Sequence, residues 1–341
     1  MSAVKWIFWN SDEQRLRFVW RFLIFLLVFV PVVALAQMAL YFLVPGISEA
    51  LTDASEAGSY DLRFIQGAAL SEWLMLIGLA LTLLIIGRWV DRRPWSDYGF
   101  HLGKRWAQDW LFGLFLGALL MSGIFLVEYL LGWVTITGFL QSIEGVSFGR
   151  AILWPLALFF AVGVFEELLS RGYLLTNFAE ALNFKFWNPT IALLLAWVIS
   201  SSLFGLAHAG NPNATTVSTI DLVLAGLFLG LGYILTGDLA LPIGVHMTWN
   251  FFQGNVFGFP VSGGAYSAAT FIAIEQKGPE VWTGGAFGPE AGLIGLIAIG
   301  VGALLVLGWV KWRYGRIQLQ RSIALPPPQQ KTSEAMTAPD V

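Results

Sequence analysis

The chain has 341 residues, of which 57% are hydrophobic and 12% are charged, with a formal net charge of −3. This composition is typical of a polytopic membrane protein and excludes an ordinary soluble globular domain. The small net charge gives no indication of a nucleic-acid partner. The sequence has no cysteine, which excludes disulfides and zinc sites built on thiolates.

Eight apolar segments are long enough, or nearly long enough, to cross a bilayer, which requires about 20 helical residues. They are expected near residues 18–44, 65–90, 107–134, 150–177, 188–208, 219–236, 239–258 and 290–311. The sixth and seventh segments are short and are joined only by Gly237 and Asp238, which predicts a tight helical hairpin. The expected fold is therefore all-α, a polytopic membrane bundle of about eight transmembrane helices.

The orientation of the chain in the membrane follows from its basic residues. The first apolar run is too long for a cleavable signal and lacks a small-residue cleavage site, so we interpret it as the first span. If the N-terminus is cytoplasmic, most of the 19 lysines and arginines fall in cytoplasmic segments, as the positive-inside rule requires. The sequence thus predicts an integral membrane protein with both termini in the cytoplasm.

The chain is expected to comprise four regions. Residues 1–149 form a three-span N-terminal membrane region, and residues 150–258 form a core that carries the polar motifs. Residues 259–311 contain a Gly-rich outer loop and the last span, and this loop is too long to be a simple connection. Residues 312–341 form a cytoplasmic tail, which is rich in Pro, Gln and Thr from Leu325 onwards and is predicted to be disordered.

Two adjacent glutamates, Glu166 and Glu167, lie in the middle of an apolar run, AILWPLALFFAVGVFEELLSRGYLL. A charged side chain at the centre of a membrane helix costs about 2.5–3.5 kcal/mol, so the pair indicates a polar site inside the bilayer. Glu167 and Arg171 are four residues apart on one helical face and are predicted to form an ion pair. Glu166 points about 100° away from that face and is free to act as a general base.

Two histidines occupy other apolar segments. His208 ends the fifth segment, four residues after Phe204, and His246 lies in the seventh, four residues before Asn250. Each pair therefore shares one helical face. A single membrane histidine or Glu–Arg pair is about as often structural as functional. Polar groups at matched spacing on three membrane segments favour a functional site.

These side chains permit two mechanisms. In the first, Glu166 and His208 activate a water that attacks a peptide carbonyl, while His246 and Asn250 donate hydrogen bonds to the oxyanion. In the second, Glu166, His208 and His246 bind Zn²⁺, whose bound water is the nucleophile. No HExxH motif is present, so a zincin helix is absent. No cofactor is certain from the sequence, and zinc stays an open alternative.

Three motifs occur in a fixed order along the chain: Glu166-Glu167-x-x-x-Arg171, Phe204-x-x-x-His208 and His246-x-x-x-Asn250. They resemble the signature motifs of the CPBP family, the CAAX proteases and bacteriocin-processing enzymes, which is also called the Abi family. The motif core covers roughly residues 150–257. The resemblance implies an intramembrane endopeptidase.

The resemblance also implies a role for each motif residue. Glu166 activates the water together with His208, and Glu167 with Arg171 supports the site. His246 and Asn250 stabilise the oxyanion. The implied partners are the lipid bilayer and a membrane-associated peptide or protein substrate, which includes CAAX-type substrates. The outer-loop sequences GFPVSGG and TGGAFGPEAG are similar to those of many prokaryotic members, which implies a prokaryotic cell membrane.

Two other functions compete with the protease. A proton-coupled transporter also places carboxylates and histidines in membrane helices, but it commonly has internal repeats, and this sequence shows none. A non-catalytic membrane scaffold would use the polar groups only to bind a partner.

Straight vertical spans would not bring the motif residues to one depth. At 1.5 Å per residue, Glu166 lies about 24 Å inward from Arg150, whereas His208 falls near the outer end of its segment. A bend, a tilt or a re-entrant segment is therefore required. The candidates are the stretch AGNPNATT after His208, and Pro242 and Gly244 in the seventh segment.

Overall fold

The computed structural model describes residues 7–11, 13–44, 46–47, 62–266 and 269–327. The tail predicted to be disordered from Leu325 onwards lies almost entirely outside these residues.

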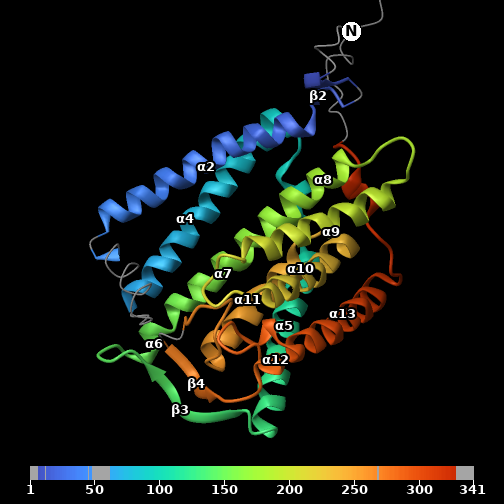
Figure 1. The fold of residues 1–341 in the computed structure, drawn as a ribbon. Helices are drawn as coiled ribbons and strands as arrows, with labels where there is room; N and C mark the ends of the chain where they lie inside the picture. The colour runs from blue at the N-terminus through green and yellow to red at the C-terminus, as the bar shows by residue number, and fades with distance from the viewer. Residues whose placement is uncertain (1–6, 12, 45, 48–61, 267–268, 328–341) are drawn as a thin grey trace, which may run out of the picture.

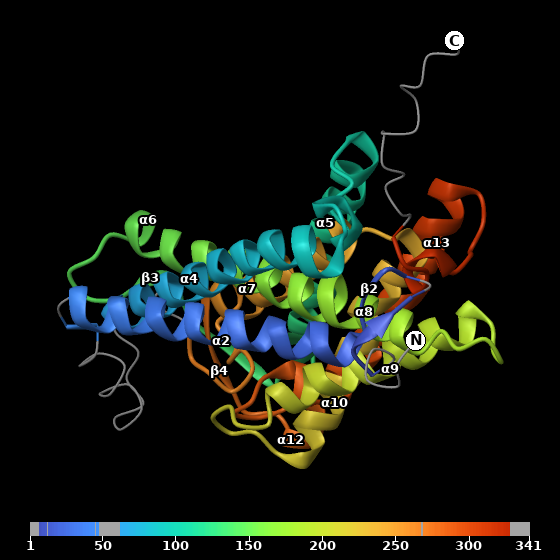
Figure 2. The same ribbon diagram turned by 90° about the horizontal axis from the view of Figure 1, so that it is seen from above.

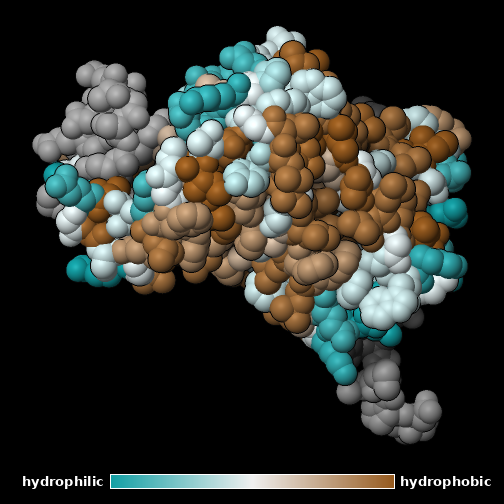
Figure 3. Space-filling view, turned by 90° about the horizontal axis from the view of Figure 1, so that it is seen from below, coloured by the Kyte–Doolittle hydropathy of each residue, from teal (hydrophilic) through white to brown (hydrophobic). Residues whose placement is uncertain are grey.

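Seven helices in the described part of the chain are long and apolar enough to cross a membrane. They span Phe18–Leu43 (α2), Leu62–Asp91 (α4 and η1), Lys104–Leu130 (α5), Phe148–Ala181 (α6, α7, η3 and α8), Pro189–Ala207 (α9), Thr216–Thr236 (α10) and Leu293–Tyr314 (α13). Large apolar side chains such as Leu27 and Phe42, each 74% exposed, cover their outer faces. On the face of the molecule that Figure 3 shows, apolar residues form a broad brown area with hydrophilic residues at its margins. The predicted membrane helical bundle is confirmed.

The seventh predicted span, residues 239–258, is not a full-length membrane helix. It forms α11 (Ala240–Phe251), followed by the π-helical η4 (Phe252–Val256). The first seven residues of α11 are all buried, and the helix packs on α5, α7 and α10. Because protein rather than lipid surrounds α11, its length does not need to match the thickness of the bilayer.

The helices are arranged around α11. Figure 1 shows α2, α4 and α7 side by side on one side of it, with α5 and α13 on the other, and the contacts follow the same order. Helices α9 and α10 pack on each other, and α10 continues the ring to α13. This order packs α7 on α11, and the π-helix that continues α7 packs on α9, so segments that are separate in the sequence converge.

The close packing of α11 on α5 depends on glycines. A Cβ atom on Gly117 of α5 would lie 2.4 Å from the carbonyl oxygen of Val245 in α11, and one on Gly113 would lie 2.5 Å from that of Leu241. Gly244 provides the matching gap on α11. Small residues spaced four apart allow membrane helices to approach backbone to backbone. The Gly113–Gly117 spacing is therefore a sequence signal for this contact.

A two-stranded antiparallel sheet lies outside the bundle and was not predicted. It pairs β3 (Val134–Ser142) with β4 (Ala269–Gln276), which lies in the predicted outer loop 259–289. Figure 2 shows the sheet and α6 (Phe148–Ala151) at one end of α7, with α8 (Thr176–Ala181) at the other. β3 begins VTI, and β-branched residues favour a strand. The all-α expectation is confirmed, and this two-stranded sheet is a small addition to the helical bundle.

The shorter elements complete the described chain. They are β1 (Trp9–Asn10), β2 (Arg15–Leu16), η2 (Trp95–Tyr98), α12 (Glu280–Thr283), η5 (Pro289–Ala291) and η6 (Arg321–Ala324). Two of the spans are divided further. In the second, α4 ends at Ile86 and η1 covers Gly87–Asp91; in the fourth, α7 covers Leu153–Glu167 and η3 covers Leu168–Leu175.

Buried ion pairs join the N-terminal segment to the end of the bundle that contains α8. Arg21 pairs with Asp91 at 2.6 Å, Arg15 pairs with Glu180 at 2.7 Å, and Arg93 also binds Glu180. All five side chains are buried. Arg15, Arg21 and Arg93, which were assigned to cytoplasmic segments, are therefore buried and connect β2, α2, η1 and α8.

We expect Gly117→Ala to lower the thermal unfolding midpoint of the detergent-solubilised protein. Its methyl group would overlap the backbone of α11, and overpacking of this kind costs about 1–3 kcal/mol. Gly123→Ala in the same helix is the matched control, because a Cβ there has no atom within 4 Å. It should leave the midpoint unchanged or raise it, since alanine is the better helix former. Equal effects of the two substitutions would contradict the close contact.

Candidate active site

The three motifs meet in the interior of the bundle. Glu166 and Glu167 lie at the C-terminal end of α7, His208 caps the C-terminus of α9, and His246 and Asn250 lie on α11. The Oε2 atom of Glu166 lies 3.8 Å from Nε2 of His208 and 3.9 Å from Nε2 of His246. The carboxylate that the sequence left free thus faces both imidazoles.

The predicted Glu167–Arg171 ion pair is present and is completely buried. Glu167 Oε1 accepts one hydrogen bond from Arg171 at 2.8 Å and one from Nδ1 of His246 at 2.9 Å. A second guanidinium nitrogen of Arg171 donates to the carbonyl oxygen of Gly226 at 2.8 Å. The guanidinium also lies 4.6 Å from the centre of the Phe204 ring. One ion pair therefore connects α7 and η3 with α9, α10 and α11.

Irregular backbone lies within the first motif and just after the other two. The π-helix η3 begins directly after Glu167, and the freed carbonyl of Ser170 within it accepts a hydrogen bond from Ser200 of α9. The helix α9 ends at Ala207, and a loop follows His208. A second π-helical turn follows α11. Such departures from α-helical geometry are common at functional sites, and they allow side chains from three spans to converge.

The hydrogen bonds of the two histidines define their tautomers. A carbonyl oxygen only accepts, so the 2.8 Å contact between His208 Nδ1 and the Phe204 carbonyl places a proton on Nδ1. His246 likewise donates its Nδ1 proton to Glu167. In the neutral rings both Nε2 atoms are therefore acceptors that face Glu166. Separations of 3.8 and 3.9 Å suit a water molecule that bridges these groups.

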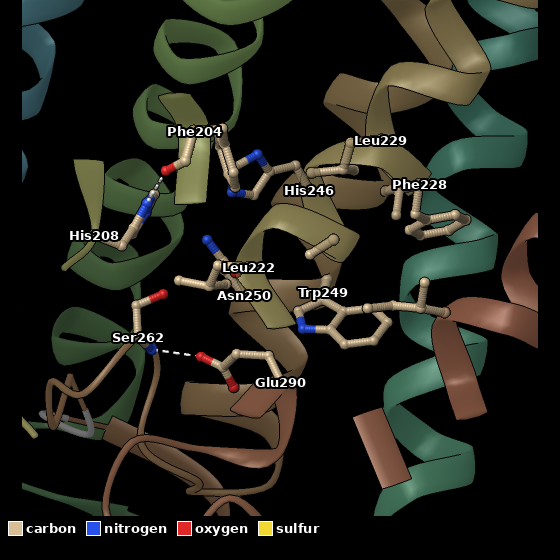
Figure 4. Close-up of a pocket in the computed structure, with 13 residues that line it drawn as sticks. Phe204, His208, Leu222, Phe228, Leu229, His246, Trp249, Asn250, Ser262 and Glu290 are labelled. Carbon is tan, nitrogen blue, oxygen red and sulfur yellow. Dashed lines mark hydrogen bonds between the residues drawn. The ribbon is translucent and has the colours of Figure 1, made fainter. Parts of the chain in front are cut away.

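Two cavities meet at the site. The larger, about 620 Å³, extends between α4, α7 and α9 and is lined by Glu166. The smaller, about 50 Å³, lies towards α10 and α13 and is mostly apolar, with Trp249 and Phe228 in its wall (Figure 4). The residues that line both cavities, and so separate them, are Phe204, His208, His246, Asn250 and Ser262.

The zinc alternative fits this arrangement poorly. Two nitrogen or oxygen ligands on a tetrahedral Zn²⁺ lie about 3.3 Å apart, which is shorter than both Glu166–imidazole separations. Within the described residues, no three His, Cys, Asp or Glu side chains are grouped closely enough to hold a metal ion. The spacing favours a water held by hydrogen bonds.

Several further polar residues line these cavities, and Glu72, Ser262 and Glu290 among them were not predicted as site residues. Glu72 of α4 lies in the wall of the larger cavity, close enough to Glu166 for the two charges to repel each other. The position of Glu72 in an apolar segment could have identified it as a candidate site residue, because ionisable residues in membrane segments are commonly functional. Ser262 and Glu290 come from the outer loop, where no periodic pattern marks them. The third histidine, His101, lies outside both cavities and contacts Asp238 at 2.9 Å.

The adjacent isosteric substitutions Glu166→Gln and Glu167→Gln should separate chemistry from stability. Glu167→Gln leaves the Arg171 charge buried without its counter-ion, a change that typically costs about 3–5 kcal/mol. Glu166 Oε2 has no hydrogen-bond partner, so Glu166→Gln should leave the unfolding midpoint almost unchanged. Tryptophan fluorescence during heating would give the unfolding midpoint of each variant. A midpoint for Glu167→Gln equal to that of the parental protein would contradict the bracing role of the ion pair.

We expect the purified, fully active protein to hold far less than one zinc per chain. The donor spacing is too wide for a tetrahedral ion, so chelation should leave the cleavage rate unchanged. Elemental analysis paired with an activity assay on the same preparation provides the measurement. Loss of activity on chelation, with recovery on zinc addition alone, would establish the metal mechanism instead.

Comparison with known proteins agrees with the motif analysis. Residues 148–252 match the family model described as type II CAAX prenyl endopeptidase Rce1-like. The chain is also 28% identical over 177 residues to an uncharacterized 24.3 kDa protein of Escherichia coli, an alignment that covers 52% of this chain and 75% of that protein. No solved structure matches the chain.

The matched segment contains all three motifs. Together with the seven apolar helices, it indicates an integral membrane protein of a protease family. The resemblance inferred from the motifs is thus confirmed, since residues 148–252 match the model of the Rce1-like CAAX prenyl endopeptidase family.

Proposed function

We propose that this protein is an intramembrane endopeptidase that uses a water activated by Glu166 and His208. The observation that supports the proposal is the position of the Glu166 carboxylate. It lies 3.8 and 3.9 Å from two imidazole nitrogens, in the wall of a cavity large enough for a peptide segment. A general base acts on a proton within hydrogen-bond reach or through one water, and these distances allow it.

The chemistry needs only water and the peptide. Glu166 and His208 hold the water, and Glu166 removes one of its protons as the oxygen attacks the scissile carbonyl carbon. The C–N bond of the tetrahedral intermediate then breaks. Protonated Glu166 returns its proton to the leaving nitrogen, which gives a carboxyl product, an amine product and the starting form of the enzyme.

Asn250 and His246 are proposed to stabilise the oxyanion. Asn250 is 9% exposed and lines both cavities, beside His208 and His246 (Figure 4). His246 can donate from Nε2 only in its imidazolium form, because its Nδ1 proton is already bound to Glu167. The negative charge of Glu167 favours that form as the oxyanion develops. Arg171 holds Glu167 in place for this role.

The substrate is proposed to be a membrane-associated peptide or protein. Apolar side chains such as Leu158, Phe159 and Val162 line much of the larger cavity, so it suits a segment that enters from the bilayer. The matching family is described by its action on prenylated CAAX proteins. For this chain, a CAAX-type substrate and an unprenylated membrane peptide are two outcomes of one experiment.

Glu166→Gln should abolish proteolysis while the protein folds and inserts normally. Without its general base, the rate should fall by at least about 100-fold. Comparison of the peptides released from membranes that contain the parental protein or Glu166→Gln would detect the activity and identify substrates. A farnesylated CAAX peptide, tested beside its unprenylated form, would distinguish the two substrate classes.

The exposed residue Glu280 provides the control, since Glu280→Gln lies in α12 outside both site cavities and should keep parental activity. Identical peptide profiles and rates for the parental protein and Glu166→Gln would refute the protease assignment. They would favour the scaffold or transporter alternatives instead.

A further inference from the structure

A short segment of the outer loop closes the active site on one side. Residues 258–264, called the strap here, contain a tight turn in which Val261 pairs with Gly264. Ser262 at its tip lines both cavities, next to His208 and Asn250 (Figure 4). Ser262 itself has a positive φ of 48°, a conformation that is uncommon for residues other than glycine.

The strap is tied to the chain immediately after two of the motifs. Asn211, three residues after His208, donates its side-chain amide to the carbonyl of Ser262 at 3.0 Å. Gln253, three residues after Asn250, donates to the carbonyl of Pro260 at 2.5 Å. The strap therefore bridges the ends of the two segments that carry His208 and Asn250.

The ionisable group that fastens this bridge is Glu290. One oxygen of its carboxylate accepts the backbone N–H of Ser262 at 2.5 Å, and the other accepts the side-chain amide of Gln253. Glu290 is 4% exposed and lines the smaller cavity. A buried carboxylate costs free energy unless its hydrogen bonds are satisfied. A stabilising role alone therefore does not explain why a carboxylate occupies this buried position.

We propose that Glu290 is a positioning residue that sets the separation of His208 and Asn250 through Ser262 and Gln253. This inference rests on the proposed function, because it assigns a task to the outer loop within the same reaction. Displacement of a catalytic group by about 1 Å can lower a rate about 100-fold. Loss of the Glu290 carboxylate should therefore slow turnover although Glu290 itself takes no part in the chemistry.

The kinetic test uses a quenched-fluorescence peptide copied from a cleavage site that requires Glu166. Glu290→Ala should lower kcat about 10–100-fold with little change in KM. Glu290→Gln keeps an oxygen that can accept the Ser262 N–H, so it should recover part of that loss. The exposed residue Glu280 supplies the matched control, and Glu280→Gln should match the parental rate.

A double-mutant cycle distinguishes positioning from a separate structural effect. If Glu290 acts through Asn250, Glu290→Ala should cost almost nothing further once Asn250→Ala is present. The proposal would be overturned if the double variant lost kcat by the product of the two single-variant factors. It would also be overturned if both Glu290 variants kept the parental kcat. If Glu290→Ala does not fold, the same cycle with Glu290→Gln decides. Activity that persists in Glu166→Gln would instead refute the protease itself, so the two failures are distinguishable.

A stability measurement tests the burial of Glu290 without any substrate. Burial raises the pKa of the Glu290 carboxyl from 4.5 to about 7, against the hydrogen bonds from Ser262 and Gln253. Because the folded protein binds this proton more tightly than the unfolded chain, the protonated carboxyl contributes most to stability below pH 4.5. This contribution is lost as the pH rises through 7. The unfolding midpoint of the parental protein, relative to Glu290→Gln, should therefore fall from pH 5 to pH 8.

The other ionisable groups around the smaller cavity are His208 and His246, and both variants share them, so their titration cancels in this comparison. A difference between the two midpoints that does not change with pH would show that Glu290 is not held in a buried, desolvated position. It would then overturn the proposed positioning role of Glu290.

Discussion

The structure depends on one buried set of charges, Glu167 with Arg171 and His246. Two charged side chains with no exposure persist in the interior only because each has partners within hydrogen-bond distance. Arg171 donates hydrogen bonds to Glu167 of α7 and to the Gly226 carbonyl of α10, and its guanidinium lies over the ring of Phe204. Glu167 also orients the imidazole of His246. The helices that carry the three motifs are therefore held together by the same pair that keeps Glu166 available.

The backbone packing makes this arrangement geometrically attainable. Gly113 and Gly117 allow α11 to lie against α5, which places a short helix at the centre of the bundle. From there His246 and Asn250 reach α7 and α9. The outer loop then covers the site, since Glu290 and Asn211 fix the strap between the ends of two motif segments. The wall of the site is thus formed by side chains from the packed helices together with Ser262 and Glu290.

The sequence predicted the relative positions of the motif residues within a helix better than the architecture around them. Spacing of four residues correctly paired Glu167 with Arg171 and turned Glu166 away, because side chains four apart share a helical face whatever surrounds them. The prediction for residues 239–258 was wrong in length, since apolar composition marks burial in protein as well as contact with lipid. The β3–β4 sheet was missed because its partners are about 130 residues apart and neither strand signals the other.

The sequence by itself determined that the chain crosses a membrane, that three of its segments carry a polar motif, and which residues share a face. These properties are local, set by composition and by the 3.6-residue turn of a helix. Only the tertiary structure decided that His246 is bound to Glu167, that both Nε2 atoms face Glu166, and that Ser262 and Glu290 reach the same cavity. These contacts arise from π-helical turns, glycine contacts and loop ties between distant segments, whose combined geometry no single stretch of sequence specifies.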